Sequence, residues 1–424
     1  MSLTQPSAPI ATAPEPSALP LPHDAARGSG KTLSLEGLRG LAAFTVILSH
    51  CVFGFYPFLH EGAATQLQAP WEPVILNSPF CALYNGTFSV CVFFVMSGYV
   101  LTRKFFAQGE VEPLQEAAVK RYLRLAPPVL GSVLFGYVLL KAGLFPAGKS
   151  DLGPFLAGAY QHEASLLAAT KEGLYRALIL GEAQYNYVLW TIQAEFIGSI
   201  ALFAFLALFG RFRGSGWLAA ATSLILIKQF PVNGLCVAMF FVGAYMHRWP
   251  DIGRRPVLLA VAVLAGLYLG GYHWNSASYT HLVTLANWLQ ARGKTAEWPL
   301  FFPALGAVLL VWGIVRENAV SRFLSLRPLV WLGDKSFAIY LLHSAVLSSL
   351  GVFVYMGLPT HLSYLTRASA ASLSVIAGTL LVAIPFARFV DARSVRLSTW
   401  FGKLAMGQLQ AFPGTGAAKR ASQR

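Results

Sequence analysis

A bundle of membrane-spanning helices is the fold that this sequence predicts, and three observations predict it. Of the 424 residues, 55% are hydrophobic and only 12% are charged. Several apolar runs are close to twenty residues long, which is the length that a helix needs to cross a bilayer. The basic residues lie mostly in short segments between these runs rather than in one patch. We therefore predict an all-α, multi-pass protein of the lipid bilayer that binds no nucleic acid, although its formal net charge is +14.

The apolar runs predict ten spans. They cover residues 38–59, 80–101, 126–145, 187–210, 217–230, 232–249, 256–274, 298–315, 329–356 and 368–390. A polar segment, residues 102–125, separates the second span from the third. Residues 1–30 are rich in Pro, Ala and Ser and predict a disordered cytoplasmic tail. Residues 31–400 then form one transmembrane domain, and residues 401–424 form a second cytoplasmic tail.

The distribution of basic residues predicts the orientation of these spans. With the N-terminus inside, the inner segments and adjoining helix ends hold 24 of the 32 Lys and Arg residues. The outer segments hold the other eight, Lys141, Lys149, Lys171, Arg176, Lys228, Arg292, Lys294 and Arg367. The positive-inside rule therefore predicts that both termini are cytoplasmic, and we expect the plasma (inner) membrane of the cell. The longest outer segment, residues 146–186, is long enough to cap a site.

The first span carries two ionisable residues, Arg39 and His50. Eleven residues along a helix place them within about 20° of the same face and ~16.5 Å apart. An ionisable side chain at that depth costs roughly 2.5 to 3.5 kcal/mol, so its presence indicates function. Two simpler interpretations remain open. His50 could only bond a neighbouring helix, and Arg39 could extend to the headgroups.

Arg121 and Arg124 stand three residues apart, so a helix would present both on one face. A guanidinium can donate two parallel hydrogen bonds to a phosphate oxygen pair, and two such groups suit a phosphate or diphosphate. The alternative is that the pair only anchors the cytoplasmic side of the membrane.

A carboxylate, Glu195, lies near the outer end of the fourth span, close to Gln193. A carboxylate in an apolar run needs a partner, and we expect His50 to be a candidate for it. Exposure of Glu195 at the membrane interface is the alternative.

Two further polar clusters occur, one where the second span meets the cytoplasm and one deep in the ninth span. Ser97 and Tyr99 flank a glycine in the second span, where close helix packing explains them equally well. Tyr340 and His343 share a helical face in the ninth span, where a structural role is again the alternative.

The remaining motifs argue against other chemistries. Cys51, Cys81, Cys91 and Cys236 have neither zinc-site spacing nor the density of a disulfide framework, so we interpret them as small core residues and expect no metal. No P-loop, dinucleotide-binding glycine motif, zinc-peptidase motif or nucleophile elbow occurs in the sequence. We expect no permanently bound cofactor.

Taken together, these clusters resemble the acyltransferase 3 family of integral membrane acyltransferases. The resemblance lies in residues 35–43 with His50, residues 92–101, the pair Arg121 and Arg124, residues 189–196 and residues 331–343. These motifs follow the family's order between about residues 33 and 396. One departure is that Gln193 and Ala194 precede the glutamate where the family commonly has Ser and Val.

The resemblance implies a ten-span enzyme that takes an acyl group, often acetyl, from cytoplasmic acyl-CoA. It passes that group to a hydroxyl, frequently on a surface carbohydrate or glycoconjugate. By analogy His50 is the catalytic histidine, and Arg39 completes its motif. Arg121 and Arg124 would meet the phosphates of the acyl donor.

We therefore expect an O-acyltransferase in which His50 is the general base and Glu195 orients the imidazole. Arg39, Arg121 and Arg124 would bind the acyl donor. The possible pocket residues are Ser97, Tyr99, Trp190, Gln193, Tyr340 and His343.

Two other classes of protein fit the same residues. One is a transporter that exports a small acid or glycan along the intramembrane Arg and His residues. The other is a membrane scaffold whose polar residues only hold helices together. The oligomeric state, the acceptor and the acyl chain stay open.

Overall fold

The computed structural model describes residues 30–146, 152, 154–253, 255–293, 296–316 and 318–407. Every regular element in this part of the chain is helical, which confirms the predicted all-α class. The predicted N-terminal tail, apart from Gly30, and residues 408–424 of the predicted C-terminal tail lie outside the described residues.

The main helices follow one another along the chain with short connections. They are α1 (Gly30–Phe55), α2 (Pro57–Glu61), α3 (Glu72–Leu76), α4 (Gly86–Gln108), α5 (Glu112–Lys141), α6 (Pro154–Gly158), α7 (Leu166–Lys171), α8 (Trp190–Phe209), α9 (Ser215–Gln229), α10 (Pro231–Tyr245), α11 (Pro256–Gly270), α12 (Thr280–Gln290), α13 (Trp298–Ile314), α14 (Ala319–Leu324), α15 (Arg327–Gly333), α16 (Ser336–Val346), α17 (Val352–Gly357), α18 (Tyr364–Phe386) and α19 (Ala392–Ala405). Four other helical segments matter for the site. Three are π-helical, η4 (Glu172–Leu180), η8 (Leu347–Gly351) and η9 (Ala387–Asp391), and one is a 3-10 helix, η5 (Tyr187–Leu189).

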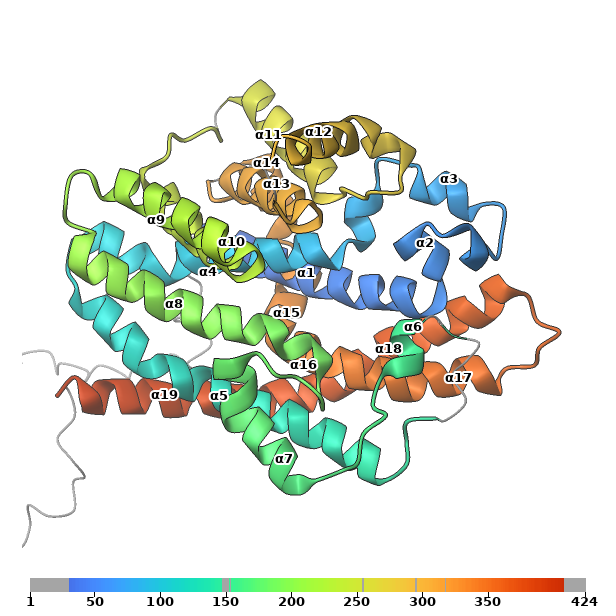
Figure 1. Cartoon of the computed structure of the whole chain (residues 1–424). Coiled ribbons are helices and arrows are strands. Elements are labelled where there is room, and N and C mark those ends of the chain that lie inside the picture. The colour runs from blue at the N-terminus through green and yellow to red at the C-terminus, as the bar shows by residue number, and fades with distance from the viewer. Residues whose placement is uncertain are drawn as a thin grey trace, which may run out of the picture.

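Helix α1 runs through the middle of the bundle (Figure 1). It packs against α4, α14, α15, α16 and α18. On one side α4 packs against α10 and α13, and on the other side α5 packs against α8, α16 and α19. The short helices α2, α3 and α6 lie at one end of the bundle together with α17, whereas α19 ends at the opposite side (Figure 1). Residues on α1 therefore contact both halves of the molecule.

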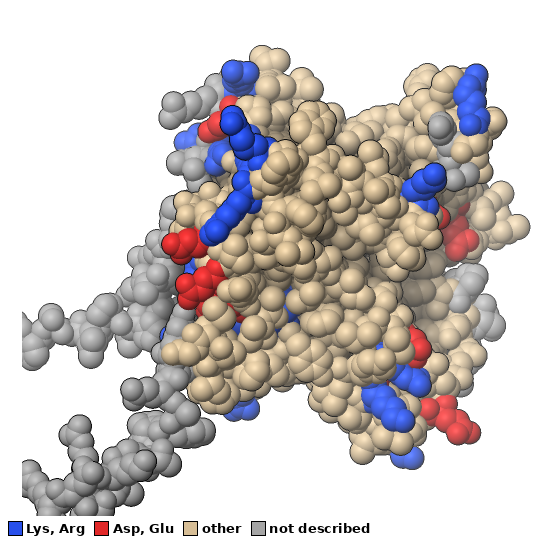
Figure 2. Space-filling model, turned by 60° about the vertical axis from the view of Figure 1, so that its left-hand side comes forward, with Lys and Arg blue, Asp and Glu red and all other residues tan. Residues whose placement is uncertain are grey.

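Six helical segments are long and apolar enough to cross a membrane. They cover Leu33–Phe55, Gly86–Gln108, Glu112–Lys141, Tyr187–Phe209, Ser336–Gly357 and Tyr364–Ala405. On the face shown in Figure 2, charged side chains gather toward opposite sides, and the surface between them is largely uncharged. These features support a multi-pass membrane protein.

The predicted spans five to eight coincide with α9, α10, α11 and α13, which have 15 to 17 residues each. These helices are shorter than an ordinary membrane span. The count of ten spans and the cytoplasmic location of both termini therefore stay predictions. Lys149 and Lys294, which enter the orientation count, lie outside the described residues.

The segment that the sequence predicts to be polar, residues 102–125, is almost entirely helical. Helix α4 continues to Gln108 and ends at Gly109, whose φ of +74° suits glycine. Helix α5 begins at Glu112 and buries Leu114, Arg121 and Leu125. These three positions recur at a helical spacing, so the charged residues between them continue a helix instead of interrupting it.

The ninth and tenth predicted spans also have different limits. The ninth is interrupted at residues 334–335, between α15 and α16. Gly333, at the end of α15, lies so close to α1 that a Cβ there would be 2.1 Å from the carbonyl oxygen of Glu36. The tenth continues through η9 into α19, so the predicted C-terminal tail begins inside a helix.

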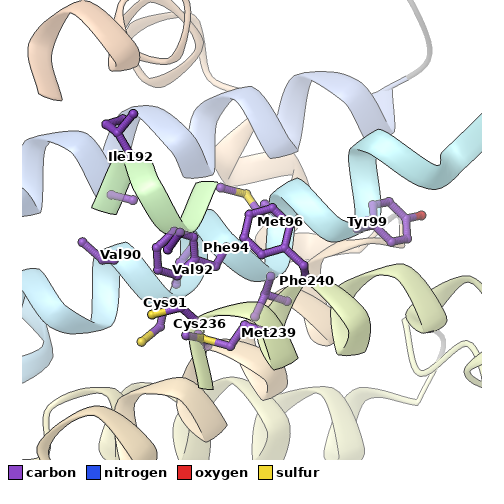
Figure 3. Close-up of a cluster of buried hydrophobic side chains, with 14 of the residues drawn as sticks. Val90, Cys91, Val92, Phe94, Met96, Tyr99, Ile192, Cys236, Met239 and Phe240 are labelled. Atoms are coloured by element: carbon purple, nitrogen blue, oxygen red, sulfur yellow. The ribbon is translucent and has the colours of Figure 1, made fainter. Parts of the chain in front are cut away.

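A buried core joins α4, α8 and α10. Figure 3 shows Phe94 and Met96 of α4 beside Phe240 of α10, with Ile192 of α8 nearby. All four cysteines are free and buried, which confirms their predicted interpretation as small core residues.

The predicted outer segment at residues 146–186 contains α6, α7 and η4. Its end is held by the buried carboxylate of Glu172, which accepts hydrogen bonds from the backbone N–H groups of Gln184, Tyr185 and Asn186. Burial raises the pKa of Glu172, and these hydrogen bonds partly offset that effect. The Asn186 side chain in turn donates to the carbonyl oxygen of Leu341 at 2.8 Å. The segment is thereby fixed to α16.

Replacing Glu172 tests how far this carboxylate holds the segment. Glu172→Ala leaves three backbone donors without their acceptor, so we expect about 1 to 3 kcal/mol of lost stability. Thermal unfolding of the detergent-purified protein should show a midpoint several degrees lower. Glu163→Ala, at an exposed position of the same segment, is the matched control and should leave the midpoint unchanged. Equal midpoints for the two variants would contradict this role.

Candidate active site

The glycines around Arg39 let other helices approach α1 closely. A Cβ on Gly37 would lie 1.7 Å from the carbonyl oxygen of Leu324, at the end of α14. A Cβ on Gly40 would lie 2.4 Å from the carbonyl oxygen of Leu329 in α15. Only glycine fits at such distances, which explains the residues flanking Arg39 in the predicted motif. Arg39 is therefore held on a helix that cannot shift away from its neighbours.

A cavity of about 320 Å³ lies between α1, α4, α5, α8 and α16. It brings together six of the predicted site residues, which are Arg39, Ser97, Arg121, Arg124, Glu195 and Tyr340. Three of these are arginines and one is a glutamate, so the charged lining has an excess of two positive charges. Phe93 and Phe94 line the cavity as well, which gives it apolar walls beside the cationic groups.

Arg121 is committed to protein partners on α8. Its guanidinium forms an ion pair with the Glu195 carboxylate, and its Nε donates to Ser199 Oγ at 2.7 Å. The hydroxyl of Ser97 on α4 donates to the same carboxylate at 3.0 Å. The expected partnership of Glu195 with His50 is therefore wrong, because this carboxylate bonds Arg121 and Ser97 instead. Sequence distance gave no information on which helix would face α8.

The other two arginines also pair with carboxylates, but their side chains differ in exposure. Arg124 pairs with Asp391 of η9, and its guanidinium lies 5.2 Å from the ring centroid of Phe337. Arg39 pairs with Glu36 at 3.3 Å, and its side chain is 38% exposed, the most exposed of the three. A guanidinium has five N–H donors, so each arginine retains donors for an anion in the cavity.

His50 contacts a second histidine, His343 of α16. The Nε2 atom of His343 lies 3.3 Å from Nδ1 of His50, and the ring centroids are 4.8 Å apart. The His50 Nδ1 is also 3.0 Å from the carbonyl oxygen of Val46, and the His343 Nδ1 is 2.7 Å from that of Tyr340.

These contacts determine which nitrogen carries the proton in each ring. A carbonyl oxygen only accepts, so the Nδ1 of each histidine must be the donor. The Nε2 of His343 then presents a lone pair to the His50 N–H, and His343 is neutral. His50 keeps its Nε2 free of these contacts, with a lone pair that can accept a proton.

The histidine pair and the arginine cavity are adjacent through Tyr340. Tyr340 lines the cavity, and its ring centroid lies 5.8 Å from that of His343, one helical turn along α16. Its hydroxyl is fixed by Thr191 at 2.6 Å and by the carbonyl oxygen of Val188 at 2.8 Å. Tyr340 and His343 therefore lie between the arginines and His50.

Three predicted pocket residues lie away from both groups. The Tyr99 ring stacks on His247 at a centroid distance of 4.1 Å, and Figure 3 shows it apart from the core around Phe94. Trp190 is 41% exposed on the outside of α8. Gln193 donates to the carbonyl oxygen of Ile179 at 2.8 Å, and so it joins α8 to η4.

Sequence reasoning missed several residues at the site. Asp391, the partner of Arg124, was recognisable as a carboxylate that follows an apolar run. Thr191 and Phe93 carry no such signal, because both are ordinary residues within apolar helices. Phe155 and Tyr187 were missed too, and their rings lie 5.8 Å and 6.0 Å from that of His50.

Comparison with known proteins shows the family of this chain. The family model described as an acyltransferase domain (Acyl_transf_3) matches residues 32–388. The chain is 24% identical to the O-acetyltransferase PaAT-1 of Phomopsis amygdali, over 86% of this chain and 83% of that protein. It is 22% identical to acyltransferase R4 of a Phoma species, over 88% of this chain and 95% of the relative. It is 23% identical to acyltransferase clz18 of Cochliobolus lunatus, over 85% and 93%. No solved structure matches.

The family match covers the arginine cavity, both histidines and nearly all of the bundle that holds them. The similar relatives are named acyltransferases, and each is matched over most of its length. This chain therefore belongs to the acyltransferase 3 family of membrane enzymes that transfer acyl groups.

Proposed function

We propose that this protein is an O-acyltransferase that moves an acyl group from acyl-CoA to a hydroxyl, with His50 as the general base. The observation that carries the proposal is the cavity in which three arginines meet, one aromatic residue away from a histidine pair. An anionic donor needs the first feature, and deprotonation of an alcohol needs the second. The name of the relative PaAT-1 supports acetyl as the acyl group.

The donor site follows from the charges of the cavity. The CoA phosphates would bind at Arg39 and Arg124, and Arg121 would hold Glu195 and Ser97 in place as well as add to the positive field. The apolar walls at Phe93 and Phe94 suit the pantetheine arm. Tyr340 marks the point where the thioester would approach the histidines. On the predicted orientation this cavity faces the cytoplasm, where acyl-CoA is made.

The chemical step uses the lone pair on the His50 Nε2. His50 takes the proton from the acceptor hydroxyl while that oxygen attacks the thioester carbonyl carbon. The C–S bond breaks, an ester is formed, and the CoA thiolate takes the proton from the imidazolium. His343 positions His50, because its lone pair and the Val46 carbonyl oxygen both accept from the His50 Nδ1–H and stabilise the imidazolium.

The acceptor is proposed to be a hydroxyl compound that meets the enzyme on the side away from the donor. A glycan or glycoconjugate is the class that the family resemblance implies, and the plasma membrane is the matching location. Only the acyl group then has to pass Tyr340, and the charged donor does not cross the bilayer.

Arg39→Ala tests the donor site with the least damage to the fold, because Arg39 is the most exposed of the three arginines. Losing charge-assisted hydrogen bonds should weaken acetyl-CoA binding about 10-fold or more. At 100 times the wild-type Kd, stabilisation should fall from about 2.7 to about 1.4 kcal/mol. Thermal shifts with acetyl-CoA, longer acyl-CoAs and free CoA measure this. The exposed Arg213→Ala is the control, and an unchanged shift in Arg39→Ala would sink this donor site.

His50→Ala tests the general base. Its loss should lower the rate of CoA release from acetyl-CoA by about 10² to 10⁴. Acetyl-CoA should still stabilise the variant, because His50 lies outside the arginine cavity. A variant that keeps more than about half of the wild-type rate would remove His50 from the mechanism.

His343 variants separate positioning from packing. In His343→Gln the amide oxygen can accept from the His50 Nδ1–H, whereas the leucine of His343→Leu cannot. We expect kcat to fall at least about 10-fold in the leucine variant, since an orienting hydrogen bond is lost, and to recover in the glutamine variant. The KM for acetyl-CoA should not change in either. Equal kcat values in the two variants would show that His343 only fills space.

A further inference from the structure

His50 also has aromatic neighbours that do not line the arginine cavity. The ring centroids of Phe155 and Tyr187 lie 4.9 Å apart, with the rings edge to face. They lie 5.8 Å and 6.0 Å from the ring centroid of His50. Tyr160 continues this wall, with its ring centroid 6.1 Å from that of Tyr187. The wall is formed by α6, by the residues after it and by η5. Helix α6 and Tyr160 belong to the segment that Glu172 and Asn186 fix in place, and η5 follows it directly.

Three hydroxyl groups in this wall are buried, and no described residue hydrogen-bonds to them. They belong to Tyr160, Tyr187 and Ser348. The Ser348 hydroxyl interacts with the Tyr187 hydroxyl, and the Ser344 hydroxyl interacts with that of Tyr160, although neither contact is a well-formed hydrogen bond. Ser344, beside Tyr160, gives its own proton to Asn186 at 2.7 Å. A buried hydroxyl without a well-formed hydrogen bond is unfavourable, so three of them grouped around Tyr187, whose ring neighbours that of His50, call for an explanation.

The backbone at Tyr160 is strained. Its φ of +56° makes it the one residue other than glycine with a positive φ in the described part of the chain. Strain of this kind persists where surrounding contacts hold it, and it occurs often at functional sites. Here the Tyr160 ring stacks on Phe145 at a centroid distance of 3.8 Å. The chain that follows Tyr160 is held at Ser165, whose backbone N–H donates a hydrogen bond to the Tyr185 hydroxyl at 2.8 Å. The strained backbone therefore holds the Tyr160 hydroxyl at a fixed place in the wall.

Ser348 also lies on an unusual backbone. It belongs to η8, a π-helical turn between α16 and α17, and its side chain is fully buried. Single π-helical turns within α-helices are frequent at functional sites. The irregular backbone at Ser348 and at Tyr160 comes from different parts of the chain, yet both bring an unpartnered hydroxyl to Tyr187.

We infer that Tyr160, Tyr187 and Ser348 form the binding site for the acceptor hydroxyl, next to the Nε2 of His50. This inference rests on the proposed function. The three hydroxyls gain the partners that they lack when an alcohol enters, and the alcohol oxygen is held for deprotonation. The proton passes to His50, and the oxygen forms the new ester bond as the C–S bond of the donor breaks. No other reactant is needed.

The chemistry of the wall defines the class of acceptor. Its side chains are aromatic rings, hydroxyls and a neutral imidazole, and none of them carries a charge. A charged acceptor would lose its hydration without finding an ion partner. The site therefore takes a neutral alcohol that presents a flat face to the rings of Phe155 and Tyr187. The ring face of a sugar and an apolar carbon skeleton both meet this requirement.

The test uses the full-length protein in detergent and water as the simplest acceptor. His50-dependent release of CoA from acetyl-CoA should fall at least about 10-fold in Tyr187→Phe/Ser348→Ala and in Tyr160→Phe. Stabilisation by acetyl-CoA should stay as in the wild type. Unchanged CoA release in all of these variants would overturn the acceptor site but leave the proposed function standing. If acetyl-CoA neither binds nor is consumed by the wild type, the proposed function fails first.

Stability provides a second readout. Because the Tyr187 hydroxyl makes no well-formed hydrogen bond to the protein, Tyr187→Phe should unfold at the same temperature as the wild type or higher. Tyr185→Phe removes a hydroxyl that makes hydrogen bonds to Ser165, so it should unfold at a lower temperature. Thr379→Val removes another buried, unpartnered hydroxyl far along α18 and should leave CoA release unchanged. A clear loss of stability in Tyr187→Phe would assign that hydroxyl to the fold.

Added alcohols distinguish the two kinds of acceptor. Methyl glucoside and cyclohexanol, each at several concentrations, should raise CoA release above the rate with water if the site fits them. Acceleration by the first indicates a sugar acceptor, and acceleration by the second indicates an apolar skeleton. Acceleration by lactate, a charged hydroxy acid, without any by neutral alcohols would overturn the assigned class.

Discussion

Charges inside this bundle must be paired, and that requirement organises the site. Arg121 and Glu195 join α5 to α8, and Ser97 of α4 completes the group. Removing either charged partner would leave the other in an apolar interior without compensation, which is costly. The pair therefore fixes three helices around one cavity, and the cavity gains its shape from it. Glu195, which the sequence places beside His50 as an expectation, belongs to this arrangement and holds Arg121 in place.

The ion pairs also leave the three arginines with different sets of protein partners. Arg121 is held by a carboxylate and by Ser199. Arg124 is held by Asp391 and packs near Phe337, while Arg39 has one short-range partner on its own helix. An entering phosphate competes least with protein contacts at the arginine that has the fewest of them. Arg39 is therefore the arginine of the three that can change partners with the least loss of protein contacts.

The sequence predicted what depends on one helix and missed what depends on two. Arg39 and His50 were placed on one helix by spacing alone, and α1 contains both. Membrane character followed from apolar length, and the helical fold followed with it. The contact of His50 with His343 joins residues 293 apart, and nothing in either helix signals it. The same holds for Arg121 with Glu195. The limits of α4 and α5 within the polar segment at residues 102–125 were missed, because a helix can carry charge on one face beyond its apolar run.

The proposed binding site for the acceptor hydroxyl shows a further limit of sequence reasoning. Tyr160, Tyr187 and Ser348 are residue types that occur throughout membrane helices, so their identity indicates nothing. Their significance comes from what each lacks, a hydrogen-bond partner, and that property exists only once the chain is folded. The left-handed φ of Tyr160 and the π-helical turn at Ser348 are likewise tertiary features. In Figure 1 the segment with α6 and the helix α17 lie at the same end of the bundle, away from the end of α19. The histidine pair thus lies between a cationic cavity and a neutral wall, and a group small enough to pass Tyr340 is the one that such an arrangement can transfer.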